Sequence, residues 1–233
     1  QPEAYEPDMA GTLNNLGNTL RELRRYEAAV AAYHEALAIL RRLAHAQPEA
    51  YEPDMAGTLN NLGNALSQLR RYEAAMEAYH EALAILRRLA HAQPEVYEPD
   101  VARTLTGLGI TLSDLRRCEA AVAAHHEALA ILRRLAHAQP EVYEPEVART
   151  LNNLGVALHR LRRSEAAVEA YQEALATYNR HDVPHEKVRT LANLGSLYIS
   201  ERRYEDALPY LREAANLVER LRAEGLSPER RRQ

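Results

Sequence analysis

The 233-residue sequence contains no phenylalanine, no tryptophan and a single cysteine, Cys118. One cysteine cannot form an internal disulfide, so packing must hold the fold together, and this usage fits a reducing compartment. No apolar run approaches the roughly 20 residues that a membrane-spanning helix needs, and no signal peptide is evident. We therefore expect a cytoplasmic protein that does not enter a membrane.

The charge balance shows no excess of positive charge. The formal net charge is −4, and Lys187 is the only lysine among 29 basic residues. This balance offers no overall electrostatic attraction to nucleic acid or to an anionic membrane. Alternating β-branched segments are also missing, whereas Ala, Leu, Glu and Arg, which favour helices, are abundant. The sequence predicts an all-α fold.

The motifs of common catalytic sites are missing as well. There is no glycine-rich phosphate loop, no nucleophile elbow and no HExxH sequence. Histidines recur at His34, His80 and His126, but repeat spacing places them on different hairpins, too far apart to share a metal ion. Cys118 stands where other repeats have tyrosine or serine, so we interpret it as tolerated variation. We expect no enzyme activity, no metal and no cofactor.

The dominant positive feature is an internal repeat of 46 residues. Residues 1–46 and 47–92 differ at only five positions, which are Thr19/Ala65, Arg21/Ser67, Glu22/Gln68, Val30/Met76 and Ala31/Glu77. Self-similarity at a period of this size is typical of stacked repeat arrays, in which each unit buries its apolar face against its neighbours. We predict one array over 1–224, with repeats at about 1–46, 47–92, 93–138, 139–180 and 181–224, followed by a basic tail over 225–233. Because the sequence starts in register with the repeat and without methionine, we also expect a fragment of a longer protein.

Each repeat reads as two helices. In the first repeat, Glu6-Pro7-Asp8 opens a helix, and apolar residues spaced by three and four continue it to about Leu23. A turn at Arg24-Arg25 leads to a second helix over 26–46. Gln47-Pro48 is predicted to end that helix, and Tyr51-Glu52-Pro53 to form a linker. Gly17 is predicted to face the small residues Ala29 and Ala36, so that the two helices approach closely.

These residues resemble the tetratricopeptide repeat. The first unit carries the family pattern at Leu13, Leu16, Gly17, Leu20, Ala29, Tyr33 and Ala36. The long period and the Thr-Leu-Asn-Asn-Leu wording look most like the kinesin light chain branch and its bacterial relatives. The resemblance implies a right-handed α-solenoid of five antiparallel helical hairpins. One departure concerns the turn, where the usual glycine is replaced by Arg24, Arg70, Arg116 and Arg162.

The resemblance further implies that the first helix of each hairpin lines a concave groove. Asparagine amides both donate and accept hydrogen bonds, so a ladder of them can hold the backbone of an extended peptide. We predict this role for Asn14, Asn18, Asn60, Asn64 and Asn152. The alternative is that these amides are solvated or bond within the hairpin. A second set lies one step round the helix and is expected to join neighbouring repeats; it comprises Asn15, Asn61, Asn153 and Asn193.

Arginines occupy the position of Gly11 and Gly57 in the later repeats, at Arg103, Arg149 and Arg189. The fork of a guanidinium suits carboxylates, so we predict a partner with an acidic side chain or a C-terminal carboxylate. The alternative is an ion pair to the acidic residue three positions earlier, which is Asp100, Glu146 or Glu186.

The sequence thus favours a protein–protein interaction scaffold that holds an extended peptide or partner segment and forms the sensor or adaptor part of a larger protein. The rival interpretation is an array that assembles end to end through the apolar face of its first helix. Single-stranded nucleic acid is disfavoured, because the predicted groove lacks aromatic residues on which bases would stack.

Overall fold

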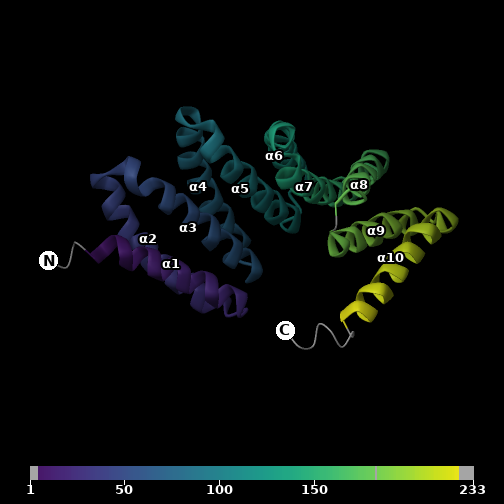
Figure 1. Ribbon diagram of the computed structural model, residues 1–233, viewed down its shortest axis with the longest axis horizontal. Coiled ribbons are helices and arrows are strands. Elements are labelled where there is room, and N and C mark those ends of the chain that lie inside the picture. The colour runs from purple at the N-terminus through teal and green to yellow at the C-terminus, as the bar shows by residue number, and fades with distance from the viewer. Residues whose placement is uncertain (1–4, 182, 226–233) are drawn as a thin grey trace. The chain divides into compact units, whose positions relative to one another are not determined.

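The computed structural model describes residues 5–181 and 183–225, and within them it contains ten α-helices and no strand (Figure 1). The helices are α1 (Glu6–Glu22), α2 (Tyr26–Ala46), α3 (Pro48–Gln68), α4 (Tyr72–Ala92), α5 (Pro94–Asp114), α6 (Cys118–Ala138), α7 (Pro140–Arg160), α8 (Ser164–Tyr178), α9 (Pro184–Ser200) and α10 (Tyr204–Gly225). The predicted all-α fold is confirmed, and both helices of the first repeat lie where the periodicity placed them. The predicted basic tail falls almost entirely outside the described residues.

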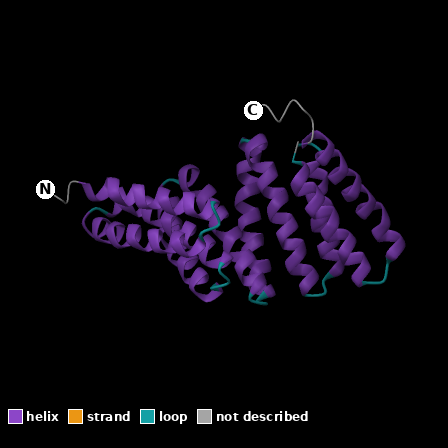
Figure 2. Cartoon of the chain, turned by 90° about the horizontal axis from the view of Figure 1, so that it is seen from below, coloured by secondary structure: helices purple, strands orange, loops and turns teal. Residues whose placement is uncertain are grey.

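Consecutive helices pack in pairs. An odd-numbered helix and the helix after it form a hairpin, as in α1–α2, α3–α4, α7–α8 and α9–α10, and the second helix of a hairpin packs on the first helix of the next, as in α2–α3 and α8–α9. Figure 2 shows these helices joined by short turns. The chain divides into two compact units, Gln1–Ile131 and Leu132–Gln233. In the first unit α1, α3 and α5 are neighbours, and in the second α7 and α9 are neighbours.

The predicted linker is absent between α2 and α3, between α4 and α5 and between α6 and α7, where one residue separates the helices. The helix α3 begins at Pro48, one residue after α2 ends, and Pro53 lies inside it. Gln47 alone separates the two helices, and its carbonyl already accepts from the backbone N–H of Ala50 (3.2 Å). Proline is well suited to the first helical position, and the apolar face that α3 buries further along outweighs the single backbone bond that Pro53 removes. Tyr51, Tyr97 and Tyr143 are therefore helical residues and not loop residues, whereas Tyr5 directly precedes α1.

The turn inside each hairpin is a left-handed helix cap built on arginine. Arg70 has φ of 58°, its N–H donates to Ser67 O (3.0 Å), and the N–H of Arg71 donates to Leu66 O (2.9 Å). This pair of bonds is the Schellman arrangement, in which glycine is the usual residue at the left-handed position. The same φ, between 57° and 62°, recurs at Arg24, Arg116, Arg162 and Arg202.

In the first four hairpins the helix glycine faces an aromatic ring, and in the fifth Gly195 faces the side chain of Leu211, so these glycines do not face small residues as predicted. A Cβ added to Gly17 would lie 2.4 Å from Cε1 of Tyr33, and the Tyr33 side chain is fully buried. Glycine is needed because the ring occupies the space of its missing side chain. His125 replaces the tyrosine in the third repeat and is also fully buried, so it is a core residue.

The second helices carry a series of exposed ion pairs between repeats. Arg41 on α2 pairs with Glu81 on α4 (2.9 Å), and Arg87 on α4 pairs with Glu127 on α6 (2.7 Å). Both partners of each pair are about half exposed, so each pair adds little stability.

Candidate functional site

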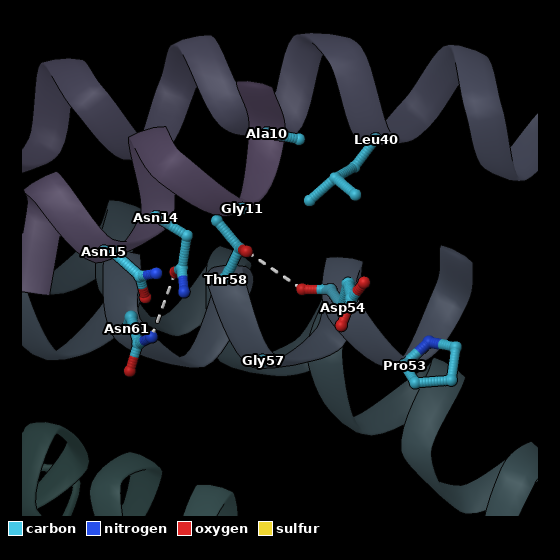
Figure 3. A pocket seen from close by; sticks show the side chains of 10 residues that line it. All are labelled: Ala10, Gly11, Asn14, Asn15, Leu40, Pro53, Asp54, Gly57, Thr58 and Asn61. Carbon is cyan, nitrogen blue, oxygen red and sulfur yellow. Dashed lines mark hydrogen bonds between the residues drawn. The ribbon is translucent and has the colours of Figure 1, made fainter. Parts of the chain in front are cut away.

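A hollow of about 300 Å³ lies between the first helices of the first two hairpins. Gly11 and Asn14 of α1 border it on one side, and Asp54, Gly57 and Asn61 of α3 on the other (Figure 3). The Thr58 hydroxyl is turned back to the main-chain oxygen of Asp54 (2.9 Å). We name this space the first hollow.

A second hollow of about 120 Å³ follows between α3 and α5. Its walls include Asn60 of α3 together with Asp100, Arg103 and Thr104 of α5. Gly57 and Asn61 line both hollows. The two hollows are therefore adjacent across α3, and together we call them the trough. It lies within the first unit, on the helices from which the groove was predicted.

The predicted residues Asn14 and Asn61 lie in the trough and bond to each other. Asn61 Nδ2 donates to Asn14 Oδ1 (3.2 Å), as the dashed line in Figure 3 shows. Asn61 thus joins two repeats, as expected for its set, and it also lines both hollows. Both side chains are partly exposed. Their remaining donors and acceptors face a space that a ligand backbone can enter.

Asn18 and Asn64 are positioned by the tyrosines of their own hairpins. The Tyr33 hydroxyl donates to Asn18 Oδ1 (2.9 Å), and the Tyr79 hydroxyl donates to Asn64 Oδ1 (2.8 Å). Burial raises the pKa of both tyrosine hydroxyls, so they stay protonated and keep donating. The oxygen of each amide is thereby used within the hairpin, and both side chains are partly exposed.

Asn60 and Asn152 are much less accessible, with exposed fractions of 7% and 1%. In the second unit, Asn152 Oδ1 accepts from Asn193 Nδ2 (2.9 Å) and from Thr190 Oγ1 (3.1 Å), both on α9. In the first unit, Asn60 Oδ1 is buried without a hydrogen-bond partner in the described part of the chain. The same predicted position thus holds a satisfied amide in one unit and an unsatisfied one in the other.

Two of the three predicted arginines form ion pairs within their own helix. Arg103 forms an ion pair with Asp100, and Arg149 forms one with Glu146, so the alternative interpretation describes these two residues. Their side chains remain 61% and 41% exposed. Arg189 is exposed on α9, and its charge acts on the buried Tyr178 hydroxyl, whose pKa burial raises to about 12.

Sequence reasoning missed Asp54 and Gly57. The signal was present in the repeat alignment, because Gly57 stands where the next repeat has an arginine paired with the acid three residues earlier. The helical pattern places Gly57 on the groove face but assigns it no contact with a ligand. Its neighbour Asp54 went unmentioned, although both line the first hollow.

A further hollow of about 490 Å³ lies at the turn end of the second unit, lined by His159, Arg162, Ser164, Ser200 and Glu201 among others. His159 Nε2 lies 3.0 Å from Ser200 Oγ, and burial lowers the pKa of His159. Across residues 5–181 and 183–225 there is no group of three or more His, Cys, Asp or Glu able to hold a metal ion. Over the same ranges, no helix combines the length and apolar character required to cross a membrane.

Paired helices that repeat along the chain, with polar hollows on their first helices, define an α-helical repeat protein of the scaffold class. The sequence profile described as "Tetratricopeptide repeat" matches residues 8–88, 54–134 and 146–220. The chain therefore belongs to the tetratricopeptide repeat family, whose repeats serve as protein–protein interaction scaffolds. No curated protein matched the sequence.

Solved structures share the fold at low identity. BtubC (BKLC) from P. vanneervenii is 23% identical, with 97% of this chain and 92% of BtubC covered and a TM-score of 0.71. A putative kinesin light chain from Podosopora anserina with nearly identical TPR-like repeats is 12% identical, with 94% and 98% covered and a TM-score of 0.73. A Rap protein complexed with competence and sporulation factor is 18% identical, with 89% of this chain and 54% of the Rap chain covered and a TM-score of 0.68. These similarities show that the helix pairs pack as in a tetratricopeptide solenoid.

Proposed function

We propose that this scaffold binds an extended peptide segment of a partner protein along the trough of the first unit. The observation that carries the proposal is the adjacency of the two hollows across α3, which share Gly57 and Asn61. Consecutive residues of an extended chain advance by about 3.3–3.6 Å, so a short segment suffices to pass from one hollow to the next. The fold of a Rap protein crystallised with competence and sporulation factor supports a ligand-holding role for this architecture.

The walls of the trough suit a peptide backbone more than a particular side chain. Asn14 and Asn61 supply partly exposed amide groups that can both donate and accept. Gly11 and Gly57 project no side chain into the space, so a backbone can approach the helices closely. The buried Asn152 is assigned a less direct role, in which it holds α9 against α7.

An acidic group on the partner remains part of the proposal at Arg189. The ion pairs to Asp100 and Glu146 already satisfy Arg103 and Arg149 in part, so a partner carboxylate would have to share these guanidiniums. In a larger protein, this chain would act as the adaptor or sensor part, and we place it in the cytoplasm because Cys118 is a free thiol.

Selection of peptides from a random display library against the chain tests the proposal. The selected peptides are titrated into ¹⁵N-labelled protein, and the amide shifts are expected to gather on α1, α3 and α5. Asn14→Ala combined with Asn61→Ala should weaken binding about tenfold or more, because the amide contacts of two trough residues are lost. His80→Ala, on an exposed position of α4, is the matched control. Shifts confined to the second helices, or equal affinity in the double variant, would refute the proposal.

Self-association is a second candidate, and it rests on the apolar face of α1. Met9 and Leu16 are 51% and 48% exposed, whereas Leu62, the equivalent of Leu16 in α3, is 4% exposed because the preceding hairpin covers it. Light scattering over a dilution series tests this candidate. Growth of the particle with concentration that Leu16→Glu abolishes would support it, and a monomer at all concentrations would exclude it.

A further inference from the structure

The repeats differ in whether one acidic residue in the first helix has an ion-pair partner on that helix. In the third and fourth repeats, Asp100 and Glu146 each form an ion pair with the arginine three residues later, Arg103 or Arg149. Residues three apart lie on the same face of a helix, so the arginine folds back onto the acid. In the second repeat the acid is Asp54, and the residue three positions later is Gly57. The partner of the acid is therefore missing from the sequence.

The space of that missing arginine is open. A Cβ placed on Gly57 would meet nothing within 4 Å, and the same holds for Gly11 of α1. By contrast, Gly63 on the same helix lies against the ring of Tyr79, where packing requires a glycine. Glycine inside a helix is unfavourable relative to other residues, so Gly57 has a cost that packing does not explain. The result of its presence is the first hollow, which Asp54 and Gly57 both line.

The Asp54 carboxylate has no partner within the described residues, where neither an ion pair nor a side-chain hydrogen bond reaches it. In Figure 3 it stands at the edge of the hollow, while the nearby Thr58 hydroxyl bonds only the main-chain oxygen of Asp54. An arginine at position 57 of α3 would form an ion pair with Asp54, as Arg103 does with Asp100. Because α3 has no such arginine, a cation that pairs with Asp54 would come from another molecule.

A second, independent observation points to a ligand that brings N–H donors. Asn60 lines the hollow next to the first one, and its Oδ1 is buried without a partner in the part of the chain that the structure describes. Asn152, its equivalent, receives hydrogen bonds from Asn193 and Thr190. On α5 the corresponding residues are Gly107, which has no donor side chain, and Thr104, whose hydroxyl is likewise buried and unpaired. A buried acceptor left without a donor is costly, so a donor from outside the chain would be bound favourably.

We infer that the first hollow is a binding slot for an arginine side chain of the partner segment, whose guanidinium pairs with Asp54 in place of the arginine that Gly57 omits. A main-chain N–H of the same segment donates to Asn60 Oδ1 in the adjacent second hollow. A guanidinium suits this slot because its planar fork can bond a carboxylate through two N–H groups. Its remaining N–H groups can donate to a neighbouring amide oxygen such as that of Asn14. This inference rests on the proposed function and names the chemistry of its ligand.

The probe is N-acetyl-arginine amide, and its neutral isostere N-acetyl-citrulline amide serves as the matched control. Each is titrated at millimolar concentration into the ¹⁵N-labelled chain, with the amides of Gly11, Gly57 and Asn61 as reporters. The arginine probe is expected to shift these amides saturably, with an affinity at least fivefold above that of citrulline. Asp54→Asn should reduce the arginine affinity to that of citrulline. Equal affinities for the two probes, or no saturable shift up to 50 mM, would overturn the inference.

Variants at Gly57 separate occupation of the slot from effects on the helix. Gly57→Arg is expected to pair with Asp54 within the chain and to abolish probe binding, whereas Gly57→Ala strengthens the helix equally but leaves the slot open and binding intact. Arg103→Gly should create a second slot at Asp100 and roughly double the number of probe molecules bound. If Gly57→Arg still binds the probe at the wild-type level, the slot is elsewhere.

The two proposals fail in different ways. Library peptides that bind the trough without any preference for arginine, and that bind Asp54→Asn as tightly as wild type, would leave the peptide-binding proposal standing and remove the arginine slot. Failure of both the probe and the library would remove both.

Discussion

Gly63 of α3 lies directly against the ring of Tyr79 of α4, so that a Cβ added to the glycine would come within 2.7 Å of Cε1 of the tyrosine. The Tyr79 side chain is 1% exposed and its hydroxyl donates to Asn64 Oδ1, so the ring has no free direction in which to move. Six residues earlier on the same helix, Gly57 faces open space. One helix therefore contains a glycine that packing requires and a glycine that it does not.

We predict opposite effects on stability for alanine at these two positions. Gly63→Ala should lower the free energy of unfolding by about 1–2 kcal/mol, because overpacking exceeds the gain in helix propensity. Gly57→Ala should raise it by about 1 kcal/mol, because its Cβ meets nothing. Urea denaturation followed by circular dichroism measures both, with a changed midpoint and an unchanged slope. Effects of the same sign would contradict the distinction between the two glycines.

The internal repeat made most of the fold predictable. The main error was the linker predicted between repeats, which came from the position of proline. Apolar residues spaced by three and four placed α1 and α2 because that spacing follows the 3.6-residue turn of a helix. Gln47-Pro48 predicts the end of a helix followed by a linker, yet Pro48 is the first residue of α3. Proline ends one helix and starts the next equally well, and the sequence around it does not say which.

The face of the first helices was harder to predict than their position. Successive residues on a helix differ by about 100°, so Asn60 and Asn61 point in different directions. Asn60 is 7% exposed and lines only the second hollow, whereas Asn61 is partly exposed and lines both, because the neighbouring hairpins pack against one side of α3. When polar residues flank the apolar stripe of a helix on both sides, the amphipathic pattern does not determine which polar side faces the trough. The contrast between Gly57 and Arg103 was visible in the repeat, but its meaning required the ion pair of Arg103 with Asp100.

The left-handed turns predict a stabilising substitution. Arg70 has φ of 58°, a conformation that costs a residue with a side chain roughly 1–2 kcal/mol and costs glycine little. Arg70→Gly should therefore raise the free energy of unfolding by about 1 kcal/mol, after allowance for the greater freedom of glycine in the unfolded chain. Ala84→Gly, at an exposed position inside α4, is the control and should lower it by about 1 kcal/mol. A destabilised Arg70→Gly would show that the arginine side chain makes a contact that offsets its backbone strain.

The buried imidazole of His125 predicts a loss of stability in acid. Burial, with a smaller contribution from the neighbouring His126, lowers the pKa of His125 from the ordinary 6.5 to about 4. Below pH 6.5 the unfolded chain takes up a proton that the folded chain refuses, so stability is complete above that pH and falls as pH drops towards 4, by up to about 3 kcal/mol.

Urea unfolding at several pH values between 7.5 and 4 measures this loss. His125→Tyr should remove much of the pH dependence, because tyrosine does not titrate in this range and Tyr171 fills the equivalent position in the fourth repeat. His126→Gln, at the exposed neighbour, is the control and should keep nearly the full slope. An unchanged slope in His125→Tyr would mean that other groups cause the acid sensitivity.

The two buried asparagines predict unequal costs of truncation. Asn152 Oδ1 accepts two hydrogen bonds from α9. Asn152→Ala leaves Asn193 Nδ2 without this acceptor, whereas the Thr190 hydroxyl keeps its bond to Glu186 O, and the substitution should cost about 1–3 kcal/mol. Asn60 Oδ1 has no donor in the described part of the chain, so Asn60→Ala removes an unsatisfied buried oxygen and should cost less than about 1 kcal/mol. Amide hydrogen exchange measures the two effects separately, with faster exchange expected in α9 for Asn152→Ala and little change in α5 for Asn60→Ala. Equal protection losses in the two variants would indicate that Asn60 Oδ1 is satisfied in solution, and it would then offer no acceptor to a bound peptide.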